Sequence, residues 1–216
     1  MKMLSCTPAV PILYEDDAVW VVNKPPGLAT IPERLNTTAP SLSKLGEQAI
    51  GKLWVVHRLD KETSGVVVFA KTSQAHRLLC AAFEHRTTRK IYWAWVHGQL
   101  TGEGVCSGPL REFGSGRVAV DPRGKPSVTA WRVLRAVQGF TLVELQPHTG
   151  RRHQIRAHLT ALGFPIVGDP LYGPADLRRG WPRMYLHALE LEITNEAWGP
   201  WRAEPEPSFL PPLQTP

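Results

Sequence analysis

"WVVHRLDKETSGVVVFAKT", residues 54–72, joins two apolar runs through a turn crowded with polar side chains. The runs WVV and VVVFA are typical of strands. The turn between them, HRLDKETSG, holds a His, an Arg, an Asp, a Lys, a Glu and two hydroxyl side chains. A simple connection between strands is usually rich in Gly, Asn or Pro. The turn therefore indicates a functional loop held on a rigid scaffold, with Asp60 as its central acid.

Asp60 has a basic neighbour on either side, because Arg58 lies two residues before it and Lys61 directly after it. These cations would favour an ionised carboxylate if they also lie close in space. An ionised carboxylate can act as a nucleophile or a base. In the other interpretation Asp60 is structural and caps the turn through Thr63, Ser64 and backbone amides, which is the usual role of an aspartate in a turn.

Apolar periodicity and turn residues predict short helices and strands outward from this loop. Helices are expected over residues 41–53, capped by Ser41, over 72–86, capped by Thr72 or Ser73, and over 151–163, stopped by Gly163. Strands are expected over 18–27, 90–98, 127–137, 140–147 and 185–194, and the Gly-rich, basic segment 102–126 is expected to be an exposed loop or hairpin. Because a regular βαβ repeat is missing, the fold class is α+β with a largely antiparallel or mixed sheet.

The length of 216 residues is compatible with a single domain over residues 1–216. Its core is expected at about residues 12–195. The tail over 204–216 is rich in proline and is expected to be irregular.

Two of the predicted elements suggest which side chains face the core. Alternation along 90–98 puts Tyr92 on the face opposite Trp93 and Trp95. Tyr92 is then either a half-buried core residue or an aromatic ring able to stack on a base or sugar. Helical spacing in 72–86 aligns an apolar stripe that is expected in the core: Leu78, Leu79, Ala82 and Phe83.

A second polar stretch, "PHTGRRHQIRAHL" at 147–159, opens the last predicted helix. Its first turn is expected to hold Arg151, Arg152 and His153, with Arg156 on the same face as His153. A helix N-terminus attracts anions, so basic residues there call for a bound anion or a paired carboxylate. Arg156 could meet Asp60 or a phosphate; the alternative is a set of surface arginines.

The basic composition favours an anionic partner, with nucleic acid first. The net charge is +6, and Arg outnumbers Lys by 17 to 8, which suits bidentate contacts to phosphate. A solvated basic face is the other interpretation. No run of about 18 apolar residues is present and the N-terminal stretch lacks a secretory signal, so no membrane association is expected. The odd set Cys6, Cys80 and Cys106 fits a reducing cytosol.

Motifs for metal or nucleotide cofactors are not found in the sequence. His153 and His158 are five residues apart and would point about 140° away from each other on a helix. HExxH, paired cysteines, a P-loop and a GxGxxG after a strand are all missing. Glu62 and Asp169 do not form an obvious partner motif with Asp60 for a two-carboxylate hydrolase. No metal and no cofactor are expected.

Five blocks in a fixed order resemble the RluA family of pseudouridine synthases. They are ILYEDDAVWVVNKPPGL (12–28), HRLDKETSGVVVFAKT (57–72), RKIYWAWVHG (89–98), HTGRRHQIRAHLTALGFPIVGDPLYG (148–173) and LHALEL (186–191). The resemblance spans about Ile12 to Ile193 and implies a mixed, mainly antiparallel sheet with a central catalytic cleft and flanking helices. No S4-like domain precedes Ile12, so the resemblance is to a short form.

The resemblance also implies roles for matching positions. Asp60 is in the place of the catalytic aspartate, and Arg58 in that of the arginine that fills the gap left by a flipped nucleotide. Tyr92 is in the place of the tyrosine that packs on the target base, and Arg156 in that of the basic partner of the aspartate. The positions expected to bind substrate are Arg58, His57, Leu186, Arg151 and His153. Arg152 departs from the small hydroxyl residue that is usual in the family.

The implied function is isomerisation of specific uridines in ribosomal and/or transfer RNA, without a cofactor. Separately, the protein is expected to be a cytoplasmic monomer. The base leaves C1′, turns, and rejoins through C5, with Asp60 as nucleophile or base. The basic segment 102–126 would then be a substrate clamp. Two alternatives remain: an RNA-binding module without turnover, and a nucleoside or glycoside hydrolase that uses Asp60.

Overall fold

The computed structural model describes residues 10–33, 36, 38–194 and 198–209. The strands are β1 Ile12–Glu15, β2 Val19–Lys24, β3 Trp54–Val55, β4 Ser64–Ala70, β5 Thr88–His97, β6 Glu103–Cys106, β7 Leu110–Glu112, β8 Val118–Val120, β9 Thr129–Val137, β10 Phe140–Pro147, β11 Leu186–Ile193 and β12 Trp201–Arg202. The helices are α1 Leu42–Ile50, α2 Ser73–Glu84 and α3 Gln154–Ala161, followed by a 3-10 turn, Pro207–Phe209.

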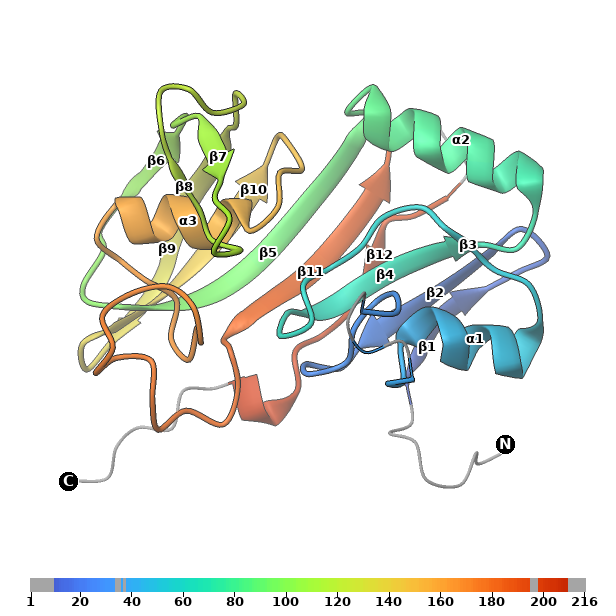
Figure 1. Ribbon diagram of the computed structural model, residues 1–216, viewed down its shortest axis with the longest axis horizontal. Helices are drawn as coiled ribbons and strands as arrows, with labels where there is room; N and C mark the ends of the chain where they lie inside the picture. Colours follow the sequence, from blue (N-terminus) through green and yellow to red (C-terminus); the bar gives the residue numbers. More distant parts are fainter. Residues whose placement is uncertain (1–9, 34–35, 37, 195–197, 210–216) are drawn as a thin grey trace.

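The predicted α+β class with a mixed, mainly antiparallel sheet is confirmed. In the described part of the chain, one sheet of ten strands runs in the order β1-β2-β4-β11-β5-β10-β9-β6, with β3 on β4 and β12 on β11. The central β4–β11 pair is parallel and the other pairs are antiparallel. The β7–β8 hairpin stands apart with α3 at one end of the sheet, and α1 and α2 lie at the other (Figure 1).

The apolar run VVVFA forms the buried strand β4, which explains its lack of polar alternation. Its side chains alternate between two cores. Val66 and Val68 pack with Leu79 of α2, whereas Val67 and Phe69 pack with Leu42 of α1. The strand β4, which follows the polar loop, is therefore fixed from both faces.

The other half of the sheet positions α3. Ile155 and Leu159 of this helix pack with Ala94 and Val96 of β5 in one cluster, which Tyr92 joins from the same strand. Trp95 belongs to a different cluster, with Tyr185 and Phe209. The predicted alternation along β5 is confirmed, and it brings Tyr92 to the face on which α3 lies.

The predicted start of the last helix is wrong by three residues. The α3 helix begins at Gln154, after His153, whose φ of 51° is left-handed. The Gln154 side chain holds the preceding turn, because its Oε1 accepts from Thr149 Oγ1 at 2.7 Å and from the Arg151 backbone N–H at 3.0 Å. Arg151 and Arg152 thus lie before the helix and not in its first turn.

The remaining expectations are mostly met at the helix ends. Ser41 and Thr72 cap α1 and α2 through their side chains, and Gly163 follows α3 with a φ of 86°. The stripe on α2 is narrower than predicted, because Leu78 is 40% exposed while Leu79 is buried.

Strands β1 and β12 were not predicted, and part of the expected irregular tail is a 3-10 turn, Pro207–Phe209. Residues 204–206 of that tail are irregular as expected, whereas residues 210–216 and the N-terminal residues 1–9 lie outside the described residues. None of the described helices has the length and apolarity to cross a membrane.

Candidate active site

The polar loop between β3 and β4 lies near the middle of the sheet, and α3 packs at one end of the same face (Figure 1). Its first residue, His57, is attached to the scaffold: Nε2 accepts the Val68 backbone N–H at 3.1 Å, and the ring stacks on Phe83 at 4.7 Å. Burial, and then the charge of Lys90, lower the pKa of His57 to about 3. His57 is therefore neutral at physiological pH and extends the β3–β4 pairing by a side-chain bond.

The far end of the loop is held by Lys24, a fully buried lysine at the end of β2. Its ammonium donates to the carbonyl oxygens of Pro25 at 2.9 Å, Leu28 at 2.7 Å and Lys61 at 3.0 Å. Burial lowers the pKa of Lys24 to about 7, against the opposing charges of Glu62 and Asp60. One of these three hydrogen bonds reaches the backbone next to Asp60, and the other two bind the turn that follows β2, so a side chain not selected from the sequence links that turn to the loop.

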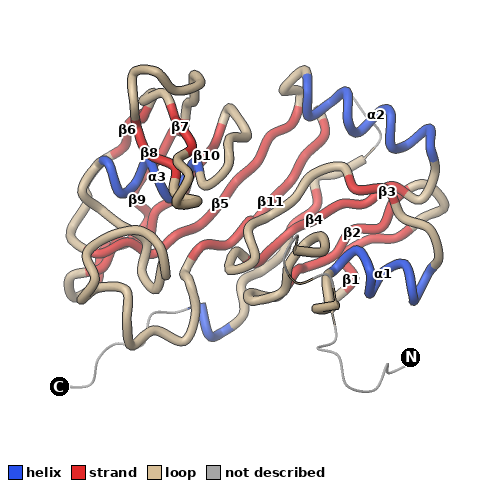
Figure 2. The backbone as a smooth tube through the Cα atoms, viewed as in Figure 1, coloured by secondary structure: helices blue, strands red, loops and turns tan. Residues whose placement is uncertain are grey.

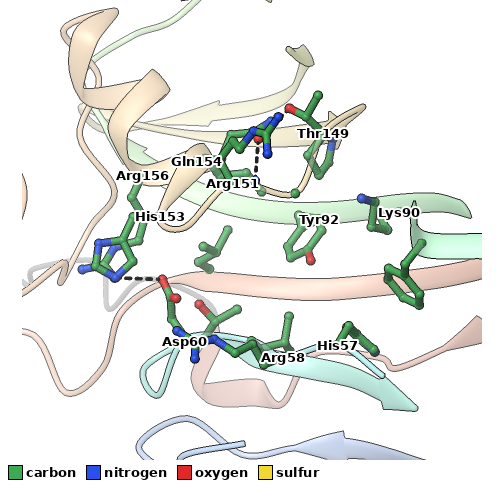
Figure 3. A pocket seen from close by; sticks show the side chains of 17 residues that line it. His57, Arg58, Asp60, Lys90, Tyr92, Thr149, Arg151, His153, Gln154 and Arg156 are labelled. Atoms are coloured by element: carbon green, nitrogen blue, oxygen red, sulfur yellow. Dashed lines mark hydrogen bonds and ion pairs between the residues drawn. The ribbon is translucent and has the colours of Figure 1, made fainter. Parts of the chain in front are cut away.

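Asp60 keeps one carboxylate oxygen available. Its Oδ2 accepts from Arg156 Nη1 at 2.9 Å, and His153 Nε2 lies 3.7 Å from the same oxygen (Figure 3). Among the described residues, no hydrogen-bond donor reaches Oδ1. The side chain is 24% exposed, so the free oxygen can meet a ligand.

Arg156 is buried and is fixed from below by Asp169. Its Nε and Nη2 donate to the two carboxylate oxygens of Asp169 at 2.7 and 2.8 Å, leaving Nη1 for Asp60. Burial alone would lower the pKa of Arg156, but the hydrogen bonds and charges of Asp169 and Asp60 raise it above its ordinary value. Asp169 is itself fully buried and accepts the backbone N–H groups of Leu171 and Tyr172. The guanidinium is therefore a fixed, permanently charged partner for Asp60.

Tyr92 reaches the site from β5, between Asp60 and Lys90 in the view of Figure 3. Burial, and then the negative charge of Asp60, raise the pKa of the Tyr92 phenol above its ordinary value. Tyr92 therefore presents a neutral phenol. Beside it, burial lowers the pKa of the Lys90 ammonium, and the charge of Arg86 lowers it further.

A cavity of about 310 Å³ gathers these side chains. All eight residues singled out from the sequence line it: His57, Arg58, Asp60, Tyr92, Arg151, His153, Arg156 and Leu186. A wider hollow of about 800 Å³ shares Arg58, Asp60 and Arg156 with it and opens toward residues 29–33. The site is therefore a small pocket behind a broad, polar mouth.

The sequence does not decide whether Arg58 and Lys61 lie close enough to Asp60 to favour its ionised form, and in the structure neither forms an ion pair with it. Lys61 pairs with Glu33 at 3.2 Å, and Arg58 lies at the mouth without an ion pair to any described residue. The alternative capping role is also not seen, because the Thr63 N–H donates to the main-chain oxygen of Asp60 at 3.1 Å. The cation on the carboxylate comes from α3, 96 positions away in the chain.

Four residues at or behind the site are not predicted from the sequence: Lys24, Lys90, Asp169 and Tyr172. The sequence analysis mentions Asp169 only as a possible second catalytic acid. A signal for it existed, since an arginine buried near a helix start needs a carboxylate. Tyr172 lies three residues further on, in the long loop from α3 to β11 (Figure 2), where no periodicity marks its orientation.

His158, the other histidine of the stretch 147–159 considered as a metal ligand, lies outside the pocket and is structural. His158 is buried in α3, with Nδ1 2.9 Å from Thr129 Oγ1 and Nε2 2.9 Å from the Gly108 carbonyl oxygen. Within the described residues, no cluster of three or more His, Cys, Asp or Glu could hold a metal ion.

Comparison with known proteins supplies the class. Residues 18–161 match the model of the RNA pseudouridylate synthase family. Within that class, the chain belongs to the RluA family of RNA pseudouridine synthases. It is 41% identical over 199 residues to the dual-specificity RNA pseudouridine synthase RluA of Vibrio vulnificus, covering 86% of this chain and 78% of that protein.

Two further relatives show how far the similarity extends. The chain is 38% identical to the ribosomal large subunit pseudouridine synthase D of Nitrosomonas europaea, over 85% of its own length and 58% of that protein. It therefore spans less than two thirds of this relative. The solved structure of human RNA pseudouridylate synthase domain containing 1 superposes with a TM-score of 0.79 at 30% identity, covering 96% of this chain and 87% of that one.

Proposed function

We propose that this chain isomerises uridine to pseudouridine in RNA, with Asp60 as the catalytic carboxylate. The observation that carries the proposal is the Asp60 carboxylate, whose Oδ2 is held by Arg156 at 2.9 Å while Oδ1 has no donor among the described residues. The reaction breaks N1–C1′, rotates the base and forms C5–C1′. The proton from C5 is lost and N1 gains one, so no electron or group is exchanged with a cofactor.

The geometry supports two first steps equally. Oδ1 can attack C1′ to form a covalent intermediate, or it can remove a proton from the sugar to give a glycal. Either step needs a carboxylate whose charge and position are fixed, and Arg156 with its partner Asp169 supports both. Tyr92, as a neutral phenol, packs against the base and can donate a hydrogen bond to it.

The target nucleotide must leave its stack, which costs a few kcal/mol. Arg58 lines both the 310 Å³ cavity and the 800 Å³ mouth, and no described residue forms an ion pair with it. It is therefore the residue that can fill the gap in the RNA and offset part of this cost. Leu186 supplies an apolar wall of the cavity.

A basic groove of about 210 Å³ extends the site toward the β7–β8 hairpin. Its charged lining residues are Arg111, Glu112, Arg123, Lys125, Arg151 and Arg152. We propose that this groove holds phosphates that flank the uridine, which gives the clamp expected over 102–126 a definite surface. Arg117 is not part of it, because its guanidinium lies over the Tyr172 ring at 5.5 Å.

The relatives' names indicate the RNA class. One is called a dual-specificity RNA pseudouridine synthase and another acts on the ribosomal large subunit. We therefore propose ribosomal and/or transfer RNA as substrate, modified in the cytoplasm by a monomer.

The test is pseudouridine mapping of RNA from cells with and without this protein, repeated with Asp60→Asn. We expect Asp60→Asn to lower the rate of pseudouridine formation by about 10²- to 10⁴-fold, the typical contribution of a general acid or base. Asp17→Asn is the matched control, because Asp17 is exposed between β1 and β2 and lines none of the hollows described here. Modification that persists in Asp60→Asn would refute the role of this carboxylate.

The two alternative functions give different products. An RNA-binding module keeps its RNA affinity in Asp60→Asn and yields no pseudouridine with the wild-type protein. A hydrolase releases free base or sugar, whereas isomerisation leaves the mass of the RNA unchanged. Mass spectrometry of a uridine-containing oligonucleotide after incubation detects the hydrolase, and pseudouridine mapping of the same oligonucleotide separates the synthase from the binding module.

A further inference from the structure

Tyr172 lies behind the catalytic pocket and connects two elements that the proposed chemistry does not link. It is 3% exposed and sits in the loop between α3 and β11. Its hydroxyl oxygen accepts the backbone N–H of Val118, in β8, at 2.8 Å. The same oxygen lies 3.1 Å from Nδ1 of His153.

These two contacts fix where the protons lie. The phenol has one proton, and Val118 N–H has already used the oxygen as an acceptor. The His153 Nδ1 is the remaining partner of the hydroxyl among the described residues, so the Tyr172 O–H donates to it. The reverse arrangement would leave a buried O–H donor unpaired, which is unfavourable.

The proton of a neutral His153 is then on Nε2, the nitrogen that lies 3.7 Å from Asp60 Oδ2. An N–H in that position attracts the carboxylate, whereas a lone pair would repel it. The distance exceeds a hydrogen bond, and contacts of this kind commonly shorten when substrate binds.

We propose that Tyr172 is a positioning residue that holds His153 in the Nε2–H tautomer, so that its N–H faces the carboxylate of Asp60. His153 and Arg156 then converge on Oδ2 and orient Oδ1 for the reaction. The inference rests on the proposed function of Asp60. Because Val118 N–H donates to the same Tyr172 hydroxyl, the His153 tautomer is also linked to the main chain of the β7–β8 hairpin.

The backbone of His153 supports this interpretation. Its φ of 51° is left-handed, a conformation that is uncommon outside glycine, although His adopts it more often than most residues, and it directs the side chain between Tyr172 and Asp60. The charged groups around the ring are Asp60, Arg156, Arg152 and Asp169. Burial lowers the pKa of His153 and outweighs the opposing effect of the Asp60 charge. The ring is therefore neutral and carries one proton, which is on either Nδ1 or Nε2.

The test is ¹⁵N NMR of the free full-length protein with labelled histidine. The His153 signals are assigned by their loss in His153→Asn, since Asn tolerates the left-handed backbone. We expect a protonated Nε2 and an unprotonated Nδ1 in the wild type. This measurement stands without any Tyr172 variant, so it remains decisive even if such a variant folds poorly.

Tyr172→Phe keeps the ring that Arg156 contacts at 5.0 Å and removes only the hydroxyl. We expect its His153 to become a mixture of tautomers. We expect kcat to fall on the order of 2- to 10-fold, the effect of one neutral hydrogen bond, with KM unchanged. Tyr185→Phe is the matched control, because the Tyr185 hydroxyl is buried and has no hydrogen-bond partner among the described residues, and it should alter neither quantity.

A proton on Nδ1 in the wild type, or an unchanged tautomer in Tyr172→Phe, overturns the inference. Synthase activity together with the wrong tautomer overturns it alone and leaves the proposed function in place. The predicted tautomer in a protein that makes no pseudouridine overturns the proposed function, while the proton assignment stands.

Discussion

Asp169 is the residue that allows an arginine to stay buried under the catalytic loop. The guanidinium of Arg156 is taken out of water, and its two bonds to Asp169, at 2.7 and 2.8 Å, compensate part of that cost. The third bond, to Asp60, is the one on which the proposed function depends. Asp169 lies deeper in the protein than Asp60 and binds Nε and Nη2 of Arg156. It therefore fixes the orientation in which Nη1 points at Asp60.

Asp169→Asn should destabilise the protein by about 3–5 kcal/mol, because it leaves a buried guanidinium without its main counter-charge. Urea unfolding of both proteins measures this difference. Glu33→Gln is the control, since it removes a carboxylate from an ion pair that is 46% and 41% exposed, for which little loss of stability is expected. Equal midpoints for Asp169→Asn and wild type would show that the buried pair is not what holds Arg156.

The loop between β3 and β4 is the element that brings Asp60 to the cavity on the face of the sheet. It has no regular structure of its own, yet both ends are bonded to strands. His57 accepts from Val68 in β4, and Lys24, at the end of β2, donates to the carbonyl of Lys61. Rigidity in this loop therefore comes from side-chain bonds to main chain, which also keep Asp60 within reach of α3.

The His57 contact predicts a pH dependence of stability. Its pKa is about 3 in the folded protein, against 6.5 for the unperturbed side chain, so the unfolded state binds a proton first as the pH falls. The contribution of neutral His57 is complete above pH 6.5 and is lost progressively down to about pH 3. His57→Gln keeps an acceptor for Val68 N–H but does not titrate.

The free energy of unfolding of wild type minus that of His57→Gln should therefore fall as the pH is lowered through this window, by at most about 1.4 kcal/mol per pH unit. Denaturant unfolding at several pH values measures it. Comparing the two proteins removes the contribution of His187, whose pKa burial also lowers, to about 4. A difference that does not change with pH would mean that His57 is not buried in its neutral form.

Elements whose identity is decided locally could be predicted from the sequence. The apolar run of β4, the cap of α2 at Thr72 and the alternation of β5 follow from short-range patterns. The start of α3 could not be predicted, because the Gln154 side chain binds the carbonyl of Val128, 26 residues away. Long-range bonds of this kind leave no periodicity in the sequence.

The same distinction applies to the site. The residues of the polar loop and of the stretch 147–159 could be selected because they combine charge with a strand or helix end. That Arg156, and not Lys61, is the partner of Asp60 depends on the way α3 packs on β5 and β10. Tyr172 looks like an ordinary aromatic in the sequence, and only its position between Val118 and His153 gives it a role.

At the scale of the molecule, the groove of about 210 Å³ near the β7–β8 hairpin adjoins the catalytic cavity, since Arg151 lines both. The helix α2 lies at the opposite end of the sheet (Figure 1). If the groove holds flanking phosphates, RNA that places a uridine in the cavity runs over the hairpin end, whereas α2 contributes Phe83 to the cavity wall and no residue to the groove. Net charge alone, +6 for the chain, does not distinguish these two ends.

Lys125→Gln should weaken RNA binding and reduce the slope of log affinity against log salt by about 0.7–0.9, the value for one lost phosphate contact. Lys125 lines the groove, is exposed, and forms no ion pair with any described residue, so its charge is available to a phosphate. Binding is measured in the Asp60→Asn background to prevent turnover. Arg77→Gln removes the same charge from the exposed face of α2 and should leave the slope unchanged. Both variants lower the net charge by the same amount. A slope that changes in both would mean that RNA affinity depends only on the overall charge. A change in Arg77→Gln alone would place the RNA at the opposite end of the sheet.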